Sequence, residues 1–255
     1  GANKNNPYSQ SNLGYMYLNG IGIQKDLREA ARLFKIAAEQ GNMIAQSNLA
    51  KMYDNGVGVK KDLKESFRLF RLSADQGDLY SLAELGWKYH QGRGIAKDYN
   101  QAHKYYIKAG NQTHALDRLG TLYRLGGEGF NPDFNKAIKY YNQSIKTDNE
   151  NPDPFYHLGQ MYFNGDGFKE RNITKAIELY TLSASKGNPK AANALSEIYD
   201  LGIGVDKNNQ KALYWIERIK NIPKYAEENF ITINNFNIDE LQKSRFSNLS
   251  NKIVQ

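Results

Sequence analysis

Cysteine is absent from the 255-residue sequence. This absence excludes disulfide bonds, thiolate metal sites and cysteine nucleophiles, and it leaves the redox compartment undetermined. Histidine is scarce, and the spacing of the four histidines matches no metal-ligand pattern: His90, His103, His114 and His157. No triad or paired-carboxylate pattern stands out either. We therefore predict a protein that is not an enzyme, with no catalytic residue, no metal and no cofactor.

Long apolar runs are also missing. No segment approaches the roughly 18 consecutive apolar residues of a membrane-spanning helix. The chain does not begin with a basic stretch followed by an apolar one, which is the pattern of a secretory leader. We expect a soluble monomer with no membrane span. For its location we favour a secreted, host-translocated or periplasmic protein whose leader has been removed over a cytoplasmic one.

The excess of positive charge is modest. The formal net charge is +7, and lysine and arginine alternate with aspartate and glutamate along the chain. This dispersal favours a solvated basic surface over a nucleic-acid footprint, which normally concentrates its basic residues on one face. Nucleic-acid binding stays the second hypothesis.

One segment recurs six times. Its leading leucines lie 34 to 39 residues apart, at Leu13, Leu49, Leu85, Leu119, Leu158 and Leu195. A tyrosine follows each leucine four residues later, and in five of the six copies a Gly-x-Gly motif follows, as in the segment Leu49–Val59. Repetition at one period of this size is the signature of a repeat array, in which each unit packs only on its neighbours.

Two helix starts recur in each unit. Asn6-Pro7, Asn151-Pro152 and Asn188-Pro189 place a capping asparagine before a proline, and Asn42 and Asp78 take the same position in units two and three. A second cap precedes the second helix, at Asp26, Asp62, Asp98, Asp133, Asn172 and Asn208. In the first two units this cap is followed by glutamate three residues later, as in a capping box. Each unit is therefore predicted to be an antiparallel helix pair.

The glycines and small residues fit this scheme. Gly56 stands where the first helix ends, and glycine adopts the left-handed cap conformation without strain. Gly58 is assigned to a second sharp turn. The residue after each leucine is small, as at Gly14, Ala50 and Gly86, which lets a neighbouring helix approach closely.

The pattern Leu-Gly-x-x-Tyr-x-x-Gly-x-Gly-Val-x-x-Asp-x-x-x-Ala, followed by Ala37-Ala38 and Gly41, resembles the Sel1-like repeat, a relative of the tetratricopeptide repeat. The resemblance implies an all-α fold, a right-handed α-solenoid of about six helix pairs. We expect units near residues 6–41, 42–77, 78–111, 112–150, 151–187 and 188–220. Residues 1–5 are interpreted as a tail or a cloning remnant. Residues 221–255 are predicted to be divergent capping helices.

The resemblance also implies that first helices line the concave side of the solenoid. In that register the expected partner-binding residues are Tyr15, Leu18, Lys51, Asp54, Trp87, His90, Arg124, Tyr156, Gln160, Phe163 and Glu197. Tyrosine, tryptophan and arginine are enriched in binding hot spots. Packing of Trp87 or Phe163 against the next layer is the alternative.

Two functions follow from these observations. The first, implied by the resemblance, is a protein-interaction scaffold or adaptor that binds another protein or peptide, in a setting such as bacterial contact with a host. The alternative is a basic helical array that binds nucleic acid, and a steep salt dependence of oligonucleotide binding distinguishes it from the first.

Overall fold

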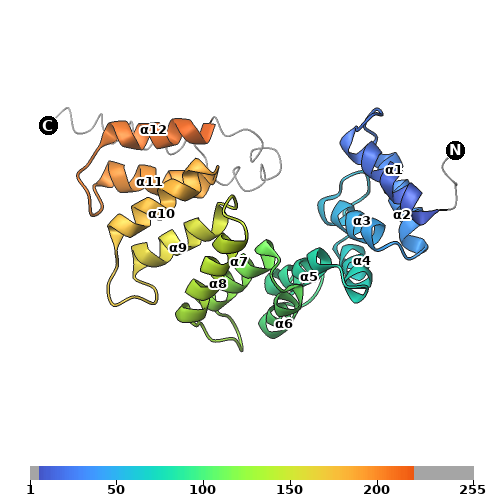
Figure 1. The fold of residues 1–255 in the computed structure, drawn as a ribbon, viewed down its shortest axis with the longest axis horizontal. Helices are drawn as coiled ribbons and strands as arrows, with labels where there is room; N and C mark the ends of the chain where they lie inside the picture. Colours follow the sequence, from blue (N-terminus) through green and yellow to red (C-terminus); the bar gives the residue numbers. More distant parts are fainter. Residues whose placement is uncertain (1–5, 221–255) are drawn as a thin grey trace.

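The computed structural model describes residues 6–220; residues 1–5 and 221–255 lie outside this description (Figure 1). The described chain forms twelve α-helices, and its only strand-like pairing is an isolated bridge between Gly127 and Phe130. The helices are α1 (Pro7–Asn19), α2 (Leu27–Glu39), α3 (Met43–Asn55), α4 (Leu63–Asp75), α5 (Leu79–Gln91), α6 (Tyr99–Ala109), α7 (Thr113–Leu125), α8 (Phe134–Thr147), α9 (Asp153–Asn164), α10 (Ile173–Ser185), α11 (Pro189–Leu201) and α12 (Asn209–Lys220). Odd-numbered helices are the first helices of six pairs, and even-numbered helices are the second. The predicted all-α helix-pair repeat is confirmed.

The pairs stack into a curved array. Each second helix packs against the first helix of the next pair, as α2 does on α3 and α10 does on α11. Neighbouring first helices also meet directly, as α5 does with α7 and α7 does with α9. In the middle of the arch, α5 and α7 lie on the inner side and α6 and α8 on the outer side (Figure 1). The first helices therefore form the inner surface there, as the resemblance implied.

The first helices begin at the predicted caps in four pairs. Their side-chain oxygens accept hydrogen bonds from amides of the first turn, at Asn6, Asn42, Asp78 and Asn188. In the fifth pair the predicted start is wrong by one residue. There α9 begins at Asp153, after Pro152, and Asn151 accepts a bond of 3.2 Å from the Asp153 amide. Pro154 then fits the first turn because the N–H that it lacks would have no partner there.

The second helices begin at all six predicted caps. The side chain of each cap accepts a bond from an amide in the first turn, at Asp26, Asp62, Asp98, Asp133, Asn172 and Asn208. The cap amide also donates to the carbonyl of the repeat tyrosine, as Asp62 does to Tyr53 at 3.0 Å. This bond recurs in all six pairs and closes the loop between the two helices.

The predicted capping boxes do not form. Glu29 and Glu65 instead turn outward and pair with Arg32 and Arg68, one helical turn along, at 2.6 and 2.7 Å. The amide of each cap already donates to the carbonyl of the repeat tyrosine, so the carboxylate pairs with the guanidinium within reach on the same helix face.

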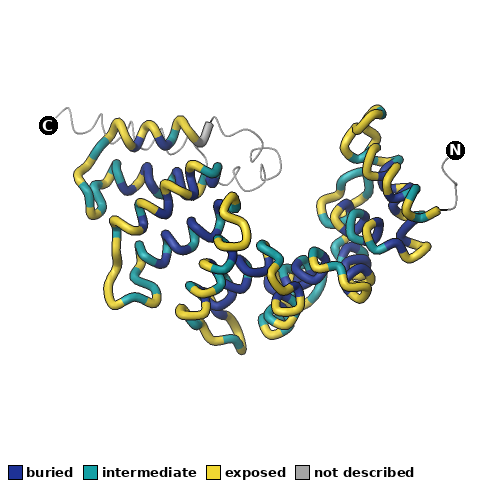
Figure 2. The backbone as a smooth tube through the Cα atoms, viewed as in Figure 1, coloured by how far each residue is buried: buried dark blue, intermediate teal, exposed yellow. Residues whose placement is uncertain are grey.

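The core follows the repeat. The leucines of the last five pairs are at most 4% exposed: Leu49, Leu85, Leu119, Leu158 and Leu195. Leu13 is 36% exposed, because no pair precedes it among the described residues. Figure 2 shows the buried stretches on helix sides that face neighbouring helices. In the four pairs where glycine follows the leucine, it faces an aromatic ring of the second helix, and a Cβ on Gly86 would lie 2.5 Å from the Tyr106 ring. The prediction of a close helix approach is confirmed.

The glycine caps also follow the prediction. Gly56 ends α3 with φ 73° and ψ 32°, in the left-handed conformation, and four other first helices end in the same way. The fourth pair departs from this pattern. There Gly126 takes φ 62° and ψ −155°, and the bridge between Gly127 and Phe130 replaces the usual turn.

The predicted tail at residues 1–5 and the predicted capping helices at residues 221–255 lie outside the described residues. At the end of the described chain, α12 leaves Leu213 and Tyr214 58% and 52% exposed.

Candidate partner-binding surface

The predicted surface residues lie on first helices, but they do not form one continuous strip of exposed side chains. On α1, Tyr15 is 51% exposed and Leu18 is half-buried, and on α3 Lys51 is exposed. The residues further along the chain divide into a polar network inside the array and a groove near its C-terminal end.

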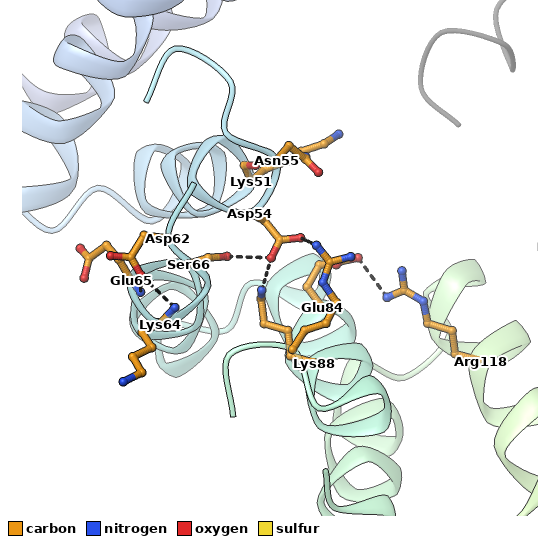
Figure 3. Close-up of polar contacts among 11 residues, drawn as sticks. Lys51, Asp54, Asn55, Asp62, Lys64, Glu65, Ser66, Glu84, Lys88 and Arg118 are labelled. Atoms are coloured by element: carbon orange, nitrogen blue, oxygen red, sulfur yellow. Dashed lines mark hydrogen bonds and ion pairs between the residues drawn. The ribbon is translucent and has the colours of Figure 1, made fainter. Parts of the chain in front are cut away.

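Asp54 belongs to the polar network. Figure 3 shows its carboxylate between α4 and α5, where it meets Ser66 and Lys88. The Lys88 side chain is 1% exposed and pairs with one carboxylate oxygen, while Arg93 pairs with the other at 3.0 Å. Burial lowers the pKa of Lys88, and the carboxylate opposes that effect. Asp54 therefore holds neighbouring pairs together and has little free capacity for a partner.

Trp87 packs against the next layer. The guanidinium of Arg118, on α7, lies 4.9 Å from the centre of the Trp87 ring. The same guanidinium pairs with Glu84 at 3.0 Å (Figure 3). A cation held over an indole face in this way stabilises the contact between the pairs. The structure thus favours the packing alternative for Trp87, which is half-buried.

The placement of His90 on the open surface is wrong. This side chain is 6% exposed and lies among the rings of Trp87, Tyr99 and Tyr106 at centroid distances of 5.6 to 6.3 Å. Burial, with a smaller contribution from the charges of Lys97 and Arg118, lowers the pKa of His90 to about 4. The bulky aromatic residues of the third pair close over this position.

Four predicted residues do come together, in a groove of about 480 Å³ between α9 and α11. Tyr156, Gln160 and Phe163 line it from α9, and Glu197 lines it from α11. Tyr180, on α10, also lines the groove, and its ring lies 5.8 Å from that of Tyr156 and 6.5 Å from that of Phe163. Ile198 and Ile203 complete the apolar lining.

Polar groups are interspersed with these rings. Gln160 donates to the Tyr156 hydroxyl at 3.0 Å, and Asn193 donates to Glu197 at 2.8 Å. Asn164 and Lys190 also line the groove. A concave, partly aromatic surface with a few amide and charged groups is typical of a binding site.

Arg124 lies beside this groove. Burial raises the pKa of Tyr156, and the positive charge of Arg124 opposes that rise at Tyr156 and at Tyr180. Arg124 belongs to α7, which packs against α9, and it is not among the residues that line the groove. The Nε atom is buried and has no hydrogen-bond acceptor among the described residues.

The sequence analysis did not identify Tyr180, Lys190, Ile198 or Ile203 as site residues. Tyr180 follows the aromatic pattern of second helices, which indicated core. Lys190 comes five residues before the repeat leucine, a position outside the register used. Residues near the start of α11 line the same groove as residues of α9. If the register also includes the position five residues before the repeat leucine, it predicts Lys190 as a groove residue.

The described residues contain no cluster of three or more histidine or acidic side chains arranged to hold a metal ion. No helix in residues 6–220 combines the length and the apolar character needed to cross a bilayer.

The fold and the groove define a class: an α-solenoid of helix-pair repeats with a concave surface formed by its first helices. Comparison of the sequence with known families identifies the repeat. The Sel1 repeat matches residues 7–42, 44–78, 79–114, 113–146, 156–188 and 189–219. The chain belongs to the Sel1 repeat family.

Solved structures agree. A Sel1 repeat protein from Oxalobacter formigenes is 34% identical with a TM-score of 0.72, over 85% of this chain and 88% of that one. A protective antigen, c5321, present in uropathogenic Escherichia coli strains is 32% identical with a TM-score of 0.64, over 84% of this chain and 45% of that one.

Curated relatives match over shorter segments. HRD3B of Arabidopsis thaliana, a component of an ERAD-associated E3 ubiquitin-protein ligase, is 29% identical over 109 residues, which are 43% of this chain and 16% of the relative. Chitin synthase regulatory factor 2 of Schizosaccharomyces pombe is 28% identical over 123 residues, which are 45% of this chain and 24% of the relative. The chain thus spans a quarter or less of these proteins. Sel1 repeat proteins generally mediate interactions between proteins, and both relatives are named as a component or a regulatory factor.

Proposed function

We propose that this protein is a non-catalytic, monomeric interaction scaffold that binds a partner protein or peptide through the inner surface of its solenoid. The groove between α9 and α11 is the principal contact in this proposal. The observation that carries it is the convergence of Tyr156, Phe163 and Glu197, from two successive pairs, on one concave volume. Tyr156 and Phe163 are half-buried, and aromatic residues beside polar groups desolvate much area at low entropic cost, which is how binding hot spots act.

The groove also suits an extended segment. Stacked first helices run side by side, so a partner that crosses them contacts several pairs at once. The side-chain amides of Gln160 and Asn164 offer both donors and acceptors to a peptide backbone. The known role of the repeat family supports the same function.

A matched pair of variants tests the proposal. Phe163→Ser alters the groove, and Leu182→Ser alters a 46% exposed leucine on α10 that does not line it. Proteins retained from a lysate by the immobilised full chain are quantified for the wild type and both variants, after melting curves confirm that all three fold. We expect partners that the wild type and Leu182→Ser retain and Phe163→Ser loses. Equal retention by all three overturns the groove as the binding surface. Light scattering tests the monomer against the chain mass of 29.0 kDa.

Nucleic-acid binding is measured in the same samples. A fluorescent oligonucleotide is titrated at several salt concentrations, because binding through phosphates weakens steeply as salt rises. Binding that is steeply salt-dependent and unchanged in Phe163→Ser contradicts the protein-scaffold proposal and supports the basic-array alternative.

The setting that we propose is contact between a bacterium and its host, with the protein outside the cytoplasm. The support is the likeness over 84% of this chain to a protective antigen of uropathogenic Escherichia coli. Fractionation of the source cells tests this setting. Recovery of the protein with the culture medium or the periplasm supports it, and recovery only with the cytoplasm contradicts it.

A further inference from the structure

Arg124 has no carboxylate partner in the described part of the chain. Other partly buried arginines of the array are paired: Arg118 with Glu84 and Arg93 with Asp54, each at 3.0 Å. The Nε atom of Arg124 is buried without an acceptor. The Tyr141 hydroxyl is a hydrogen-bond partner of this guanidinium, but a hydroxyl is neutral. A guanidinium that is partly removed from water and has no anion beside it is unfavourable, so an anionic group of a partner would stabilise it.

Arg124 lies beside the groove that we propose as the principal binding contact. Arg124 is on α7, which packs against α9, the helix that contributes Tyr156 and Phe163 to the groove. Lys190, which is exposed, supplies a cation in the lining. Glu197 is the single acidic residue of the lining, and Asn193 already donates to its carboxylate. The lining itself holds one cation and one carboxylate, and Arg124 on the neighbouring α7 adds a positive charge.

The apolar part of the groove lies next to this charge. Phe163 and Ile198 face it from neighbouring first helices, with Tyr180 from the second helix between them. Their surface suits one large apolar side chain. A ligand that satisfies both parts carries a carboxylate close to such a side chain.

We propose that the groove binds an acidic peptide segment, in which a carboxylate pairs with Arg124 and an adjacent large apolar side chain packs between Phe163 and Ile198. This inference rests on the proposed function and adds the chemistry of the partner. Arginine pairs with carboxylate through two parallel hydrogen bonds, which fixes direction as well as charge. A peptide fits better than a nucleic acid because Tyr156 and Tyr180 already pack against one another, at 5.8 Å, rather than standing free to stack on bases.

The first experiment selects peptides from a displayed random heptapeptide library on the full chain. With the wild type we expect enrichment of aspartate or glutamate next to phenylalanine, leucine, isoleucine or tyrosine. With Arg124→Gln the acidic enrichment disappears and the apolar enrichment remains, and Arg124→Lys restores part of it. With Phe163→Ser the apolar enrichment disappears. Acidic enrichment that is absent in the wild type, or that persists in Arg124→Gln, overturns the inference.

The second experiment measures affinity for one selected peptide and its Asp→Asn analogue by fluorescence anisotropy. We expect the analogue to bind the wild type at least tenfold more weakly, and Arg124→Gln to bind the two peptides equally. Such non-additive losses show that the two groups interact directly. An oligonucleotide that displaces the peptide from the wild type overturns the inference in favour of a phosphate ligand.

Failure of the inference and failure of the proposed function give different results. Peptides that depend on Phe163 but not on Arg124 leave the scaffold function intact and overturn only the acidic chemistry. Selections that are identical for the wild type, Phe163→Ser and Leu182→Ser, or that yield no binder, contradict both. Melting temperatures within a few degrees of the wild type establish that each variant is folded.

Discussion

Gly58 lies directly against the backbone carbonyl of Leu27, the first residue of the second helix in the preceding pair. A Cβ at position 58 would overlap that carbonyl oxygen. Gly94 meets the carbonyl of Leu63 in the same way. In the last two pairs the equivalent glycines, Gly167 and Gly204, approach the side chain at the matching helix start, at Phe134 and Ile173. The second glycine of the Gly-x-Gly motif thus packs against the start of the second helix in the preceding pair.

We predict that Gly58→Ala destabilises the protein much more than Gly22→Ala. Both glycines have nearly the same positive φ, 68° and 69°, so the conformational cost of alanine is about 1 kcal/mol at each. At Gly22 a Cβ would meet only Met16, at 3.8 Å, whereas at Gly58 it would overlap Leu27. The overlap adds about 1–3 kcal/mol. Urea unfolding measures the difference, and equal losses would show that the contact between pairs relaxes freely.

The two glycines of the motif show what a sequence pattern can predict. The left-handed cap at Gly56 was predicted because it depends on the local backbone alone. The turn assigned to Gly58 is also present, since its φ is positive. Its contact with Leu27 was missed, because it depends on how closely one pair stacks on the next. That distance is set by side chains about 30 residues away, which a local motif does not contain.

We predict that Asp54→Ala lowers the free energy of unfolding by roughly 3 kcal/mol, because it leaves the buried Lys88 without its carboxylate. Lys88→Met combined with Asp54→Asn should recover most of this loss. Methionine occupies the equivalent, buried position in two other pairs, at Met52 and Met161. Chemical denaturation of the two variants provides the comparison.

The surface pair between Glu65 and Arg68 is the control for this experiment. Its side chains are 30% and 58% exposed, so Glu65→Gln should cost less than about 0.5 kcal/mol. A loss at Asp54 no larger than the loss at Glu65 would mean that the interior network contributes no more than a surface ion pair.

We predict that His90 makes the protein less stable in acid. Its pKa in the folded protein is about 4, below the ordinary value of 6.5, because burial disfavours the charged ring. Between these values the unfolded chain binds a proton that the folded chain does not, so the free energy of unfolding falls as the pH drops from 6.5 to 4. The contribution approaches roughly 3 kcal/mol at pH 4.

Denaturation curves for the wild type and His90→Gln, taken between pH 7 and pH 4, isolate this contribution from that of the carboxylates. The variant should show a shallower dependence on pH. His114→Gln is the control, since it replaces a histidine at an exposed position in the same way. Parallel curves for the wild type and His90→Gln would contradict the assignment.

The candidate site was only partly predictable from the sequence. The repeat register placed Tyr156, Gln160, Phe163 and Glu197 on one face, and the structure brings them into one groove. The same register placed His90 on the surface, where the structure buries it under Trp87, Tyr99 and Tyr106. Equivalent positions differ in exposure because each is covered by whatever side chains its own neighbours carry. The repeat period predicts which face of the helix a residue occupies. The side chains of the adjacent helices determine how far that residue is buried.

The two aromatic residues of the inner surface at the same repeat position, Tyr15 and Trp87, should therefore behave differently. Trp87→Ala removes the indole that contacts Arg118 and His90, and we expect a loss of about 1–2 kcal/mol in the free energy of unfolding. Tyr15 is 51% exposed, so Tyr15→Ala should change stability by no more than about 0.5 kcal/mol. Thermal and urea unfolding of the two variants, at matched protein concentration, separates the cases. A Trp87→Ala protein that unfolds like the wild type would return Trp87 to the set of side chains free to bind a partner.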